Sequence, residues 1–431
     1  MDAQKARHDA VGHPLSDSTA TGYIKRMSTA LTKPSSQSEQ PIRYDIAVVG
    51  GGPTGLSAAL ALAKAGFATA LIAPKDRVFD TGRTAAVMAP ALEFLAPLLP
   101  DGALEAIGWP LAGIRIVDVT GSLFRAPTVT FMAGDIDLDR FGLNVSNEEL
   151  VRLMTGLLAG IPNLTHYENA ITDLDCGAHS CILTLDTGET LRTRGVVGAD
   201  GRLSKIREAT GIAARQWTYK QSALTFHVEH PRDHLDISTE FHTREGPLTF
   251  VPLKNGVSSV VWMMAQDRAA KLQACDPAEF VKAVQGASHS FLGALALVSG
   301  RGLIPMAGLG AASYAKGRVA LIGEAIHVFP PIGAQGLNLG LRDAAVLVKS
   351  MTSHRDDLIA AFAAYARARQ IDVPLRTAAV DALNRSLLLD LAPLDLMRSA
   401  GLTALSAFSP LKRAVMRMGI GDSNLLGLSR R

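Results

Sequence analysis

Cysteine is scarce in this chain, which has three cysteines among 431 residues: Cys176, Cys181 and Cys275. They form no Cys-x-x-Cys pair and no cluster with histidines, so we expect neither a metal site nor a disulfide framework, and a reducing compartment is the default. The sequence also lacks a run of roughly 18 uncharged apolar residues, the length that a membrane-spanning helix needs. We therefore expect no disulfide-rich, metal-stabilised or membrane-spanning architecture.

The sequence also has no large excess of positive or negative charge. The chain has 43 Lys and Arg residues against 40 Asp and Glu residues, for a net charge of +3, and this balance does not indicate nucleic-acid binding. Aromatic residues make up only 5% of the chain, and its 48% hydrophobic share comes mostly from Ala and Leu. A chain of this length can bury a large core and predicts two or three domains or subdomains.

Residues 1–43 lack apolar periodicity and are rich in Ser, Thr, Gln and Asp. This composition predicts a disordered N-terminal extension. The segment has no apolar core of a secretory signal, and its acidic residues argue against a transit peptide. Translation starts at Met1 or at Met27, which lies close to the start of the predicted fold.

The stretch from Tyr44 to Gly66 is the strongest local signal in the sequence. Asp45 to Val49 is a β-branched apolar run typical of a buried parallel strand, and an Ala- and Leu-rich helix follows the turn. In that turn Gly50 allows the tight bend, Gly52 lets the backbone approach a pyrophosphate, and Gly55 lets the helix lie against the strand. The turn reads Gly50-Gly51-Gly52-Pro53-Thr54-Gly55. An ordinary βα turn of another doubly wound protein is the alternative interpretation.

The second predicted strand, Ala68 to Ala73, departs from the usual dinucleotide-binding pattern. An acidic residue normally ends this strand and holds a ribose, but the chain has Ala73 there, which leaves the ribose to Lys75, Asp76 or backbone groups. A helix is predicted from Gly82 to about Leu99. Arg83 at its start either pairs with a phosphate or is a solvated side chain.

A second glycine motif follows a predicted meander of three strands. The last strand runs into Gly198-Ala199-Asp200-Gly201, which places a carboxylate beside bare backbone, as suits the hydroxyls of a ribityl chain. The alternative is a plain Asp-Gly turn. The predicted elements are strands 114–119 and 126–131, a helix over 147–158, and meander strands 170–175, 180–186 and 190–197.

Residues 215–300 change to alternating segments that predict an antiparallel sheet. Its strands are expected at 223–229, 237–243, 248–253 and 257–264. The aromatic side chains of one face either wall a substrate cavity or form ordinary core. They are Phe226, Phe241, Phe250 and Trp262.

The third motif spans Arg318 to Ala344. A buried strand ends at Gly323-Glu324, a Pro330-Pro331 loop follows, and Gly333-Ala334-Gln335-Gly336 leads into a helix through Leu337 and Asn338. The start of that helix offers hydrogen-bond donors to an electron-rich group such as a reduced flavin ring. His327 is either catalytic or a structural hydrogen-bonding residue.

The order and separation of these three motifs resemble those of the single-component FAD-dependent aromatic hydroxylases. Within that superfamily, Gln335 to Asp343 and Glu245-Gly246-Pro247-Leu248 resemble the ubiquinone-biosynthesis hydroxylases of the UbiH/UbiF type. The resemblance covers residues 44 to about 420. The chain differs from the family in having Glu324 for the usual Asp, Ala334 for the usual Gly, and no acid after the second strand.

The resemblance implies roles for individual residues. The glycines of the first motif, with Pro53 and Thr54, meet the FAD pyrophosphate, and Arg83 meets the phosphate or ribityl region. Asp200 and Gly201 serve FAD and NAD(P)H, while Gly323 and Glu324 contact the ribityl chain. The flavin ring lies beside Pro331 and the turn at Gly336, Leu337 and Asn338. No residue is identified as a base for the phenol.

The resemblance also implies an α/β fold like that of p-hydroxybenzoate hydroxylase, with a Rossmann-like FAD-binding domain, an inserted antiparallel-sheet substrate domain and a helical C-terminus. The expected boundaries are 1–43 for the extension, 44–213 and 301–370 for the FAD-binding domain, 214–300 for the substrate domain, and 371–431 for the C-terminal segment. Strands near 114–131 contribute to the substrate side.

The implied reaction is the hydroxylation of an aromatic ring. NAD(P)H or a ferredoxin-type donor reduces FAD, O2 adds at flavin C4a, and the hydroperoxide transfers an OH to the ring of a polyprenylated phenol in ubiquinone biosynthesis. Two alternatives are an FAD-dependent reductase or dehydrogenase without oxygen activation, and a non-catalytic, FAD-bound scaffold of a quinone-synthesis complex.

The C-terminal segment 398–431 combines an apolar stripe with positive charge. It carries six basic residues and one acidic residue, for a net charge of +5. Basic residues beside an apolar stripe suit an anionic lipid surface, so we expect either peripheral contact with the inner face of the membrane or packing on the protein itself, or on a partner of a quinone-biosynthesis complex. The expected localisation is cytoplasmic, with or without that contact. The stripe consists of Leu402, Leu405, Phe408, Leu411, Val415 and Met418.

Overall fold

The computed structural model describes residues 43–75, 84–121, 127–329, 335–370 and 408–420. Its first sheet has the order β18-β19-β11-β1-β2-β8, and the five strands from β19 to β8 pair in parallel. Their apolar runs are buried in one large core with the helices α1 and α8. The strands are β1 (Tyr44–Val49), β2 (Thr69–Ile72), β8 (Leu164–Tyr167), β11 (Thr190–Gly198), β18 (Ala315–Lys316) and β19 (Val319–Leu321).

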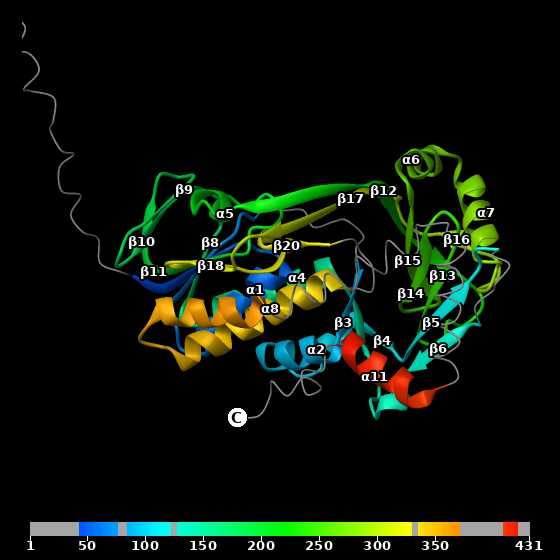
Figure 1. Cartoon of the computed structure of the whole chain (residues 1–431), viewed down its shortest axis with the longest axis horizontal. Coiled ribbons are helices and arrows are strands. Elements are labelled where there is room, and N and C mark those ends of the chain that lie inside the picture. The colour runs from blue at the N-terminus through cyan, green and yellow to red at the C-terminus, as the bar shows by residue number, and fades with distance from the viewer. Residues whose placement is uncertain (1–42, 76–83, 122–126, 330–334, 371–407, 421–431) are drawn as a thin grey trace, which may run out of the picture. The chain divides into compact units, whose positions relative to one another are not determined.

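Helices pack on this first sheet (Figure 1). The helix after the first glycine turn is α1, and α8 follows the third motif. Ser146 caps α4 by accepting a hydrogen bond from the Glu149 N–H, as the predicted helix over 147–158 requires. The helices are α1 (Pro53–Lys64), α4 (Asn147–Leu157), α5 (Lys205–Ala209) and α8 (Gln335–Ser353), with short 3-10 turns η3 (Leu158–Gly160) and η4 (Gly323–Ala325).

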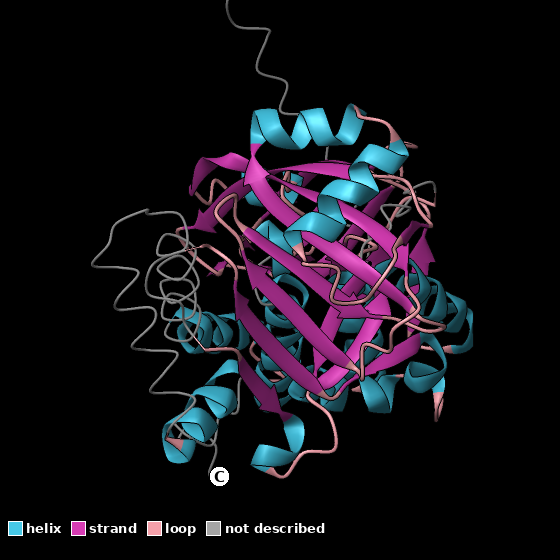
Figure 2. Ribbon diagram, turned by 90° about the vertical axis from the view of Figure 1, so that its right-hand side faces the viewer, coloured by secondary structure: helices cyan, strands magenta, loops and turns pink. Residues whose placement is uncertain are grey.

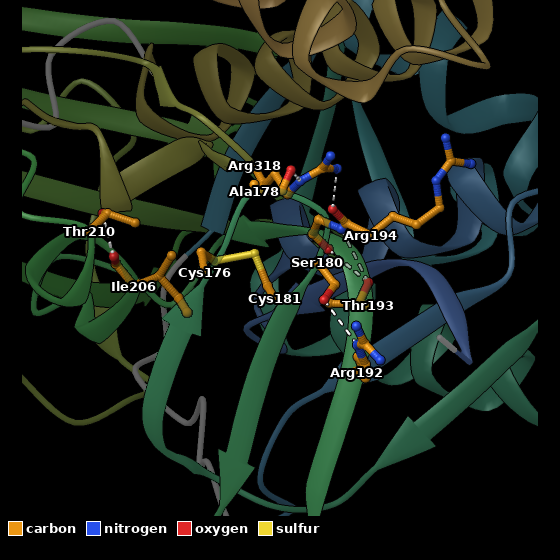
Figure 3. Close-up of a disulfide and its surroundings, with 11 residues drawn as sticks. Cys176, Ala178, Ser180, Cys181, Arg192, Thr193, Arg194, Ile206, Thr210 and Arg318 are labelled. Atoms are coloured by element: carbon orange, nitrogen blue, oxygen red, sulfur yellow. Dashed lines mark hydrogen bonds between the residues drawn. A yellow bond between two sulfur atoms is a disulfide. The ribbon is translucent and has the colours of Figure 1, made fainter. Parts of the chain in front are cut away.

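The predicted meander is confirmed, and it contains a disulfide that we did not expect. Strands β9 (Ile171–Cys176) and β10 (Cys181–Leu185) pair antiparallel with Cys176 opposite Cys181, and the two sulfur atoms are bonded (Figure 3). The expectation of no disulfide is therefore wrong for this pair. The spacing is not a Cys-x-x-Cys motif, but a hairpin brings the two residues face to face.

The second sheet is also confirmed and has the order β20-β17-β12-β15-β14-β13-β5-β6, with β16 beside β12. Most neighbours are antiparallel, whereas β13 and β5 are parallel. The strands are β5 (Gly113–Asp118), β6 (Val129–Met132), β12 (Ala214–Glu229), β13 (Ile237–His242), β14 (Pro247–Pro252), β15 (Val257–Ala265), β16 (Ala296–Leu297), β17 (Gly302–Ala311) and β20 (His327–Val328).

One face of this second sheet is covered by α6 (Gln266–Ala274) and α7 (Pro277–Ala287). Figure 2 looks toward this side of the sheet, and Figure 1 shows α6 next to β12 and α7 next to β16. The predicted aromatic stripe packs here: Phe226 lies 4.7 Å from Phe280 of α7 between ring centroids, and Phe241 lies 6.1 Å from Phe250. The stripe is core packing under α6, α7 and the segment that follows α7, where Phe291 packs on Phe241 and Phe250, so these side chains do not wall a cavity.

A third, small sheet corrects the helix predicted over 82–99. Thr84–Met88 forms strand β3, which pairs antiparallel with β7, and the helix α2 begins only at Ala89. Pro90 in the first turn of α2 is compatible with a helix start and not with a helix interior, which explains the late beginning. The remaining elements are β4 (Gly108–Leu111), β7 (Gly142–Ser146), α2 (Ala89–Leu95), α3 (Ala103–Ile107), η1 (Ala96–Leu98) and η2 (Ala133–Ile136).

The helix α11 (Ser409–Ile420) packs beside this region. Its Met416 is buried in a cluster with Phe131 and Phe141, and its Lys412 Nζ lies 2.8 Å from Asp135 Oδ2. Within the described ranges, no helix has both the length and the apolar character that crossing a bilayer demands. The division into an FAD-binding and a substrate domain, with boundaries at 214 and 301, stays a prediction, although β12 and β17 begin beside those positions.

Candidate functional site

Three of the predicted motifs meet at one edge of the first sheet. Gly50 follows β1, Asp200 follows β11 by two residues, and Gly323 follows β19 by two residues. The three strands are parallel neighbours: Val49 pairs with Gly198, and Gly198 pairs with Leu321. Because the carboxyl ends of parallel strands lie at the same edge, the sequence-distant motifs form one site there.

The first glycine turn is shaped by close backbone contacts on one side and is open on the other. A Cβ atom on Gly50 would lie 2.2 Å from the Ala199 carbonyl oxygen, and one on Gly55 would lie 2.1 Å from the Gly50 carbonyl oxygen. A Cβ atom on Gly52 would meet no atom within 4 Å. No side chain caps the start of α1 at Gly52, so the N–H groups of that helix turn are accessible to a phosphate.

The Asp-Gly turn presents an unused acceptor. The Asp200 Oδ2 atom accepts a hydrogen bond of 3.2 Å from the Ile206 N–H. Its Oδ1 atom is buried and has no hydrogen-bond partner among the described residues. Gly201 has a φ of 84°, a conformation that leaves the backbone bare beside this carboxylate. An orphaned carboxylate oxygen at this edge suits a hydroxyl group of a ligand.

The start of α8 is fixed against β3 and α1. Asn338 accepts a hydrogen bond of 2.8 Å from the Met88 N–H and donates one of 2.7 Å to the Ala86 carbonyl oxygen. A Cβ atom on Gly340 would lie 2.4 Å from Thr54 Oγ1, so the two helices approach closely near Pro53 and Thr54. At the first turn Gly336 is exposed and Leu337 partly exposed. The turn at Gly336 to Asn338 is thus held in place with its backbone accessible.

A buried ionic cluster holds the backbone of the third motif in place. The Asp343 carboxylate, which is fully buried, accepts hydrogen bonds from the Gly323 N–H at 2.9 Å, His327 Nε2 at 2.7 Å and Arg369 Nε at 2.6 Å. Burial by itself would raise the pKa of Asp343, but the charges of His327 and Arg369 and the hydrogen bonds hold it below its usual value. The cluster positions Gly323, whose φ is 63°.

His327 is 3% exposed, and its ring stacks on Phe329 with centroids 5.3 Å apart. Its Nε2 atom is engaged by Asp343, an arrangement that favours the structural interpretation of this residue over the catalytic one. Glu324 lies in η4 with an exposed side chain. Arg83, Asp76 and Pro331 lie outside the described residues.

Sequence reasoning missed three charged residues that the structure places around the site. Arg207 is buried and donates hydrogen bonds to the carbonyl oxygens of Ala325 at 2.7 Å and Arg202 at 2.9 Å, so it joins the second and third motifs. Asp343 belongs to the quoted third motif but carried no predicted role of its own. Glu168, directly after β8, forms an ion pair of 3.3 Å with Lys75. A charged residue in a short helix or at a strand end carries no sequence signal of burial or pairing.

These features fit a flavin dinucleotide. An uncapped helix start beside an open glycine suits the pyrophosphate, and the orphaned Asp200 oxygen suits a ribityl or ribose hydroxyl. Among the described residues, no group of three or more His, Cys, Asp or Glu side chains is arranged to hold a metal ion.

Comparison with known proteins agrees with this assignment. A family model described as "FAD binding domain" matches residues 163–357, and one described as "FAD dependent oxidoreductase" matches residues 45–224. The ubiquinone hydroxylase UbiL of Rhodospirillum rubrum is 32% identical over 88% of this chain and 90% of its own. The 3-demethoxyubiquinol 3-hydroxylase of Escherichia coli is 28% identical over 88% of this chain and 98% of its own.

Solved structures show the same fold. The p-nitrophenol 4-monooxygenase PnpA of Pseudomonas putida superimposes with a TM-score of 0.73 at 19% identity, covering 88% of this chain and 99% of that one. PqsL of Pseudomonas aeruginosa, a probable FAD-dependent monooxygenase, gives a TM-score of 0.66 at 21% identity, covering 84% and 99% of the two chains. The α/β fold predicted from the sequence is thereby confirmed.

Proposed function

Because the chain belongs to the family of FAD-dependent ubiquinone-biosynthesis hydroxylases, we propose that it hydroxylates the ring of a polyprenylated phenol in that pathway. The enzyme is an FAD-dependent monooxygenase. The observation that carries the proposal is the 32% identity to a ubiquinone hydroxylase along nearly the full length of both chains, together with the convergence of Gly50, Asp200 and Gly323 at one sheet edge.

Different residues of the site bind different parts of the cofactor. The open turn at Gly52, with Pro53 and Thr54, receives the pyrophosphate, and Asp200 accepts a hydrogen bond from a cofactor hydroxyl. When bound, FAD supplies the transfer of electrons from NAD(P)H, or from a ferredoxin-type donor, and the activation of O2. Asn338 holds the start of α8, whose backbone N–H groups would donate to the electron-rich part of the bound cofactor.

Other residues act by positioning. Arg207 and Asp343 fix the backbone of the third motif, because each bonds main-chain atoms of the Gly323–Ala325 turn. Glu324, Gly201 and Leu337 lie where a ribityl chain and a ring would pass. The division of labour between an FAD-binding part at 44–213 and 301–370 and a substrate part at 214–300 belongs to the same proposal.

The proposal includes peripheral contact with a membrane through residues 398–431, at a cytoplasmic location, or contact with a partner of a quinone-biosynthesis complex. A polyprenylated substrate resides in lipid, and the described part of this segment supports the idea: Phe408 is 59% exposed just before α11. Arg413 is exposed on the same helix.

Two measurements test the proposed function. The purified protein should be yellow and hold one non-covalent FAD per chain. A deletion strain should accumulate an under-hydroxylated quinone precursor, which mass spectrometry detects and re-expression removes. A flavoprotein that oxidises NAD(P)H without consuming O2 when given the precursor would be a reductase, and one that never accelerates NAD(P)H oxidation would be a scaffold. A colourless protein that does not take up added FAD would contradict the proposal altogether.

A further inference from the structure

The second sheet has two faces with different surroundings. On one face Phe241, Phe250 and Val260 are buried in a cluster with side chains of α6, of α7 and of the segment that follows α7. On the other face their alternating neighbours form a row across four adjacent strands, in which Glu240 pairs with Thr249, Thr249 with Val261 and Val261 with Thr225. All four side chains of this row are partly exposed although their strands lie inside the sheet. The described parts of the chain therefore do not fully cover the middle of this face.

The row, which we call the Glu240 row (Glu240, Thr249, Val261 and Thr225), lies on the side that carries the flavin motifs. Ile116 of β5 is the register partner of Glu240 and packs against a cluster that contains Ala86 and Met88. These two residues are the ones whose backbone Asn338 holds at the start of α8. A continuous set of contacts thus joins the Glu240 row to the candidate flavin site.

Glu240 is held in a defined orientation. Its Oε1 atom lies 2.9 Å from His242 Nε2, and its Oε2 atom accepts a hydrogen bond of 3.2 Å from Thr249 Oγ1. The His242 side chain is 6% exposed and that of Glu240 is 18% exposed, so the carboxylate is the member that a ligand can reach. A carboxylate has about four acceptor sites and two are used here, which leaves capacity for another donor.

Next to Glu240 this face carries the polar residues Thr249, His242 and Asp118, the register partner of His242, and it becomes apolar farther along the sheet. Val261 belongs to the row itself, and Ala223, Met263 and Met306 form an apolar cluster beside it on the same face. On the other side Ile116 continues the apolar surface. One oriented acceptor beside an apolar stretch of the same face matches a ligand that has a hydroxyl donor on an apolar ring with apolar substituents.

We propose that Glu240 binds the ring hydroxyl of the substrate and accepts its proton, with Thr249 and His242 as positioning residues; the inference rests on the proposed function. The phenolic O–H bond breaks, an O–H bond forms on the Glu240 carboxylate, and the negative charge passes to the ring. This charge makes the ring more electron-rich for hydroxylation. The protonated Glu240 carboxyl group returns its proton to the product oxygen, while the hydroxylated carbon releases its own hydrogen as a proton to water.

The test compares two ligands that differ only in the donor: 2-hexylphenol and its methyl ether, titrated calorimetrically into the FAD-loaded, full-length protein. The wild type should bind the phenol roughly 10- to 100-fold more tightly, as expected for a hydrogen bond to a charged group. Glu240→Leu should abolish this preference, and Glu240→Gln should retain only part of it. Thr249→Val should reduce the preference, and Thr249→Ser, which keeps the hydroxyl, should restore it.

The matched control is Glu245→Gln, which removes a carboxylate from the same hairpin. Glu245 is exposed and pairs with Arg268, so this variant should bind both ligands like the wild type. FAD content and the thermal melting curve establish that each variant is folded. The proposal is overturned if the wild type binds the two ligands equally or binds neither, or if Glu240→Leu keeps the preference. Failure of the proposed function would instead show as the absence of a quinone precursor in the deletion strain, with the phenol preference intact.

Discussion

Gly50 and Gly52 stand two residues apart in one turn, yet a side chain would have different consequences at each position. Gly52 has a φ of −75° and open space around its missing Cβ, so the apoprotein can accommodate a larger residue there. Gly50 has a φ of 127° and faces the Ala199 carbonyl oxygen. The two glycines therefore serve different purposes, one for the ligand and one for the fold.

We predict that Gly52→Val folds but loses FAD, because the branched side chain occupies the space that the pyrophosphate needs. Gly50→Val should instead lower the free energy of unfolding by more than about 3 kcal/mol, since both the backbone conformation and the contact are unfavourable. Flavin absorbance per chain and urea unfolding of the apoproteins separate the two effects. Asp200→Ala should likewise weaken FAD binding, by about 1.5–3 kcal/mol. Full flavin retention in Gly52→Val and Asp200→Ala would show that the site is assigned wrongly.

Asp343 is a second residue whose replacement should lower the free energy of unfolding. In Asp343→Asn the Arg369 guanidinium, which is 1% exposed, keeps its charge and loses its ion pair with the Asp343 carboxylate. Breaking a buried pair in this way costs about 3–5 kcal/mol. Chemical denaturation should show this loss, whereas Asp356→Asn, at an exposed position, should change the free energy of unfolding by less than about 0.5 kcal/mol.

The stability difference between wild type and Asp343→Asn should depend on pH in a defined direction. The pKa of Asp343 in the folded protein lies below its unfolded value of about 3.9, so its contribution to stability is complete above that pH. The contribution is lost as the pH falls through the folded pKa. The stability difference between wild type and Asp343→Asn should therefore shrink below about pH 4. A difference that grows on acidification would contradict the assignment.

At the scale of elements, the sequence predicted those parts in which one local pattern decides the structure. The β-branched run before Gly50 and the alternating segments of β9 to β11 became strands because their periodicity matches burial on one face or two. The prediction of a helix over 82–99 is wrong for its first part, because β3 is stabilised by pairing with β7, a strand nearly 60 residues away. The intrinsic helix or strand propensity of a segment contains no information about such distant partners.

The candidate site follows the same division. The glycines and Asp200 were recognisable because backbone approach demands specific residue types at fixed spacings. The roles of Arg207, Asp343 and Glu240 depend on which strands and helices become neighbours, so no local pattern marked them. The disulfide is an intermediate case. The sequence shows two cysteines at the ends of neighbouring predicted strands, but only the register of β9 against β10 places them opposite each other.

The Cys176–Cys181 bond closes only a short loop within a hairpin that is already hydrogen-bonded. Arg318 and Arg192 also hold this loop through Ala178 and Ser180, as Figure 3 shows. We predict that replacing both cysteines by serine lowers the free energy of unfolding by at most about 2 kcal/mol and leaves FAD content unchanged.

Thiol titration of the denatured, non-reduced protein checks the bond itself. The wild type should show one reactive thiol, from Cys275, and Cys275→Ser should show none. Three titratable thiols in a preparation made without reductant would mean that the bond does not form.

At the scale of the whole molecule, α11 connects the C-terminal segment to the rest of the protein. Its Met416 is buried, and its Lys412 is engaged by Asp135, whose pKa is lowered chiefly by that hydrogen bond. Part of the basic charge of 398–431 is therefore used within the protein. Phe408 and Arg413 remain exposed and can meet a surface.

The contrast between the paired Lys412 and the exposed Arg413 allows a specific test of membrane contact. Full-length protein should float with anionic vesicles at low salt and should float less with neutral vesicles or at high salt, because each basic group near the surface contributes about 1 kcal/mol and salt screens it. Arg413→Ala should weaken flotation about fivefold, whereas Lys412→Ala should change it less, since Asp135 already holds that ammonium group. Replacing Leu405, Phe408 and Leu411 by serine should keep the protein in the soluble fraction with FAD still bound. If the wild type stays at the bottom of the gradient at low salt, the segment is structural and a partner must deliver the polyprenylated substrate.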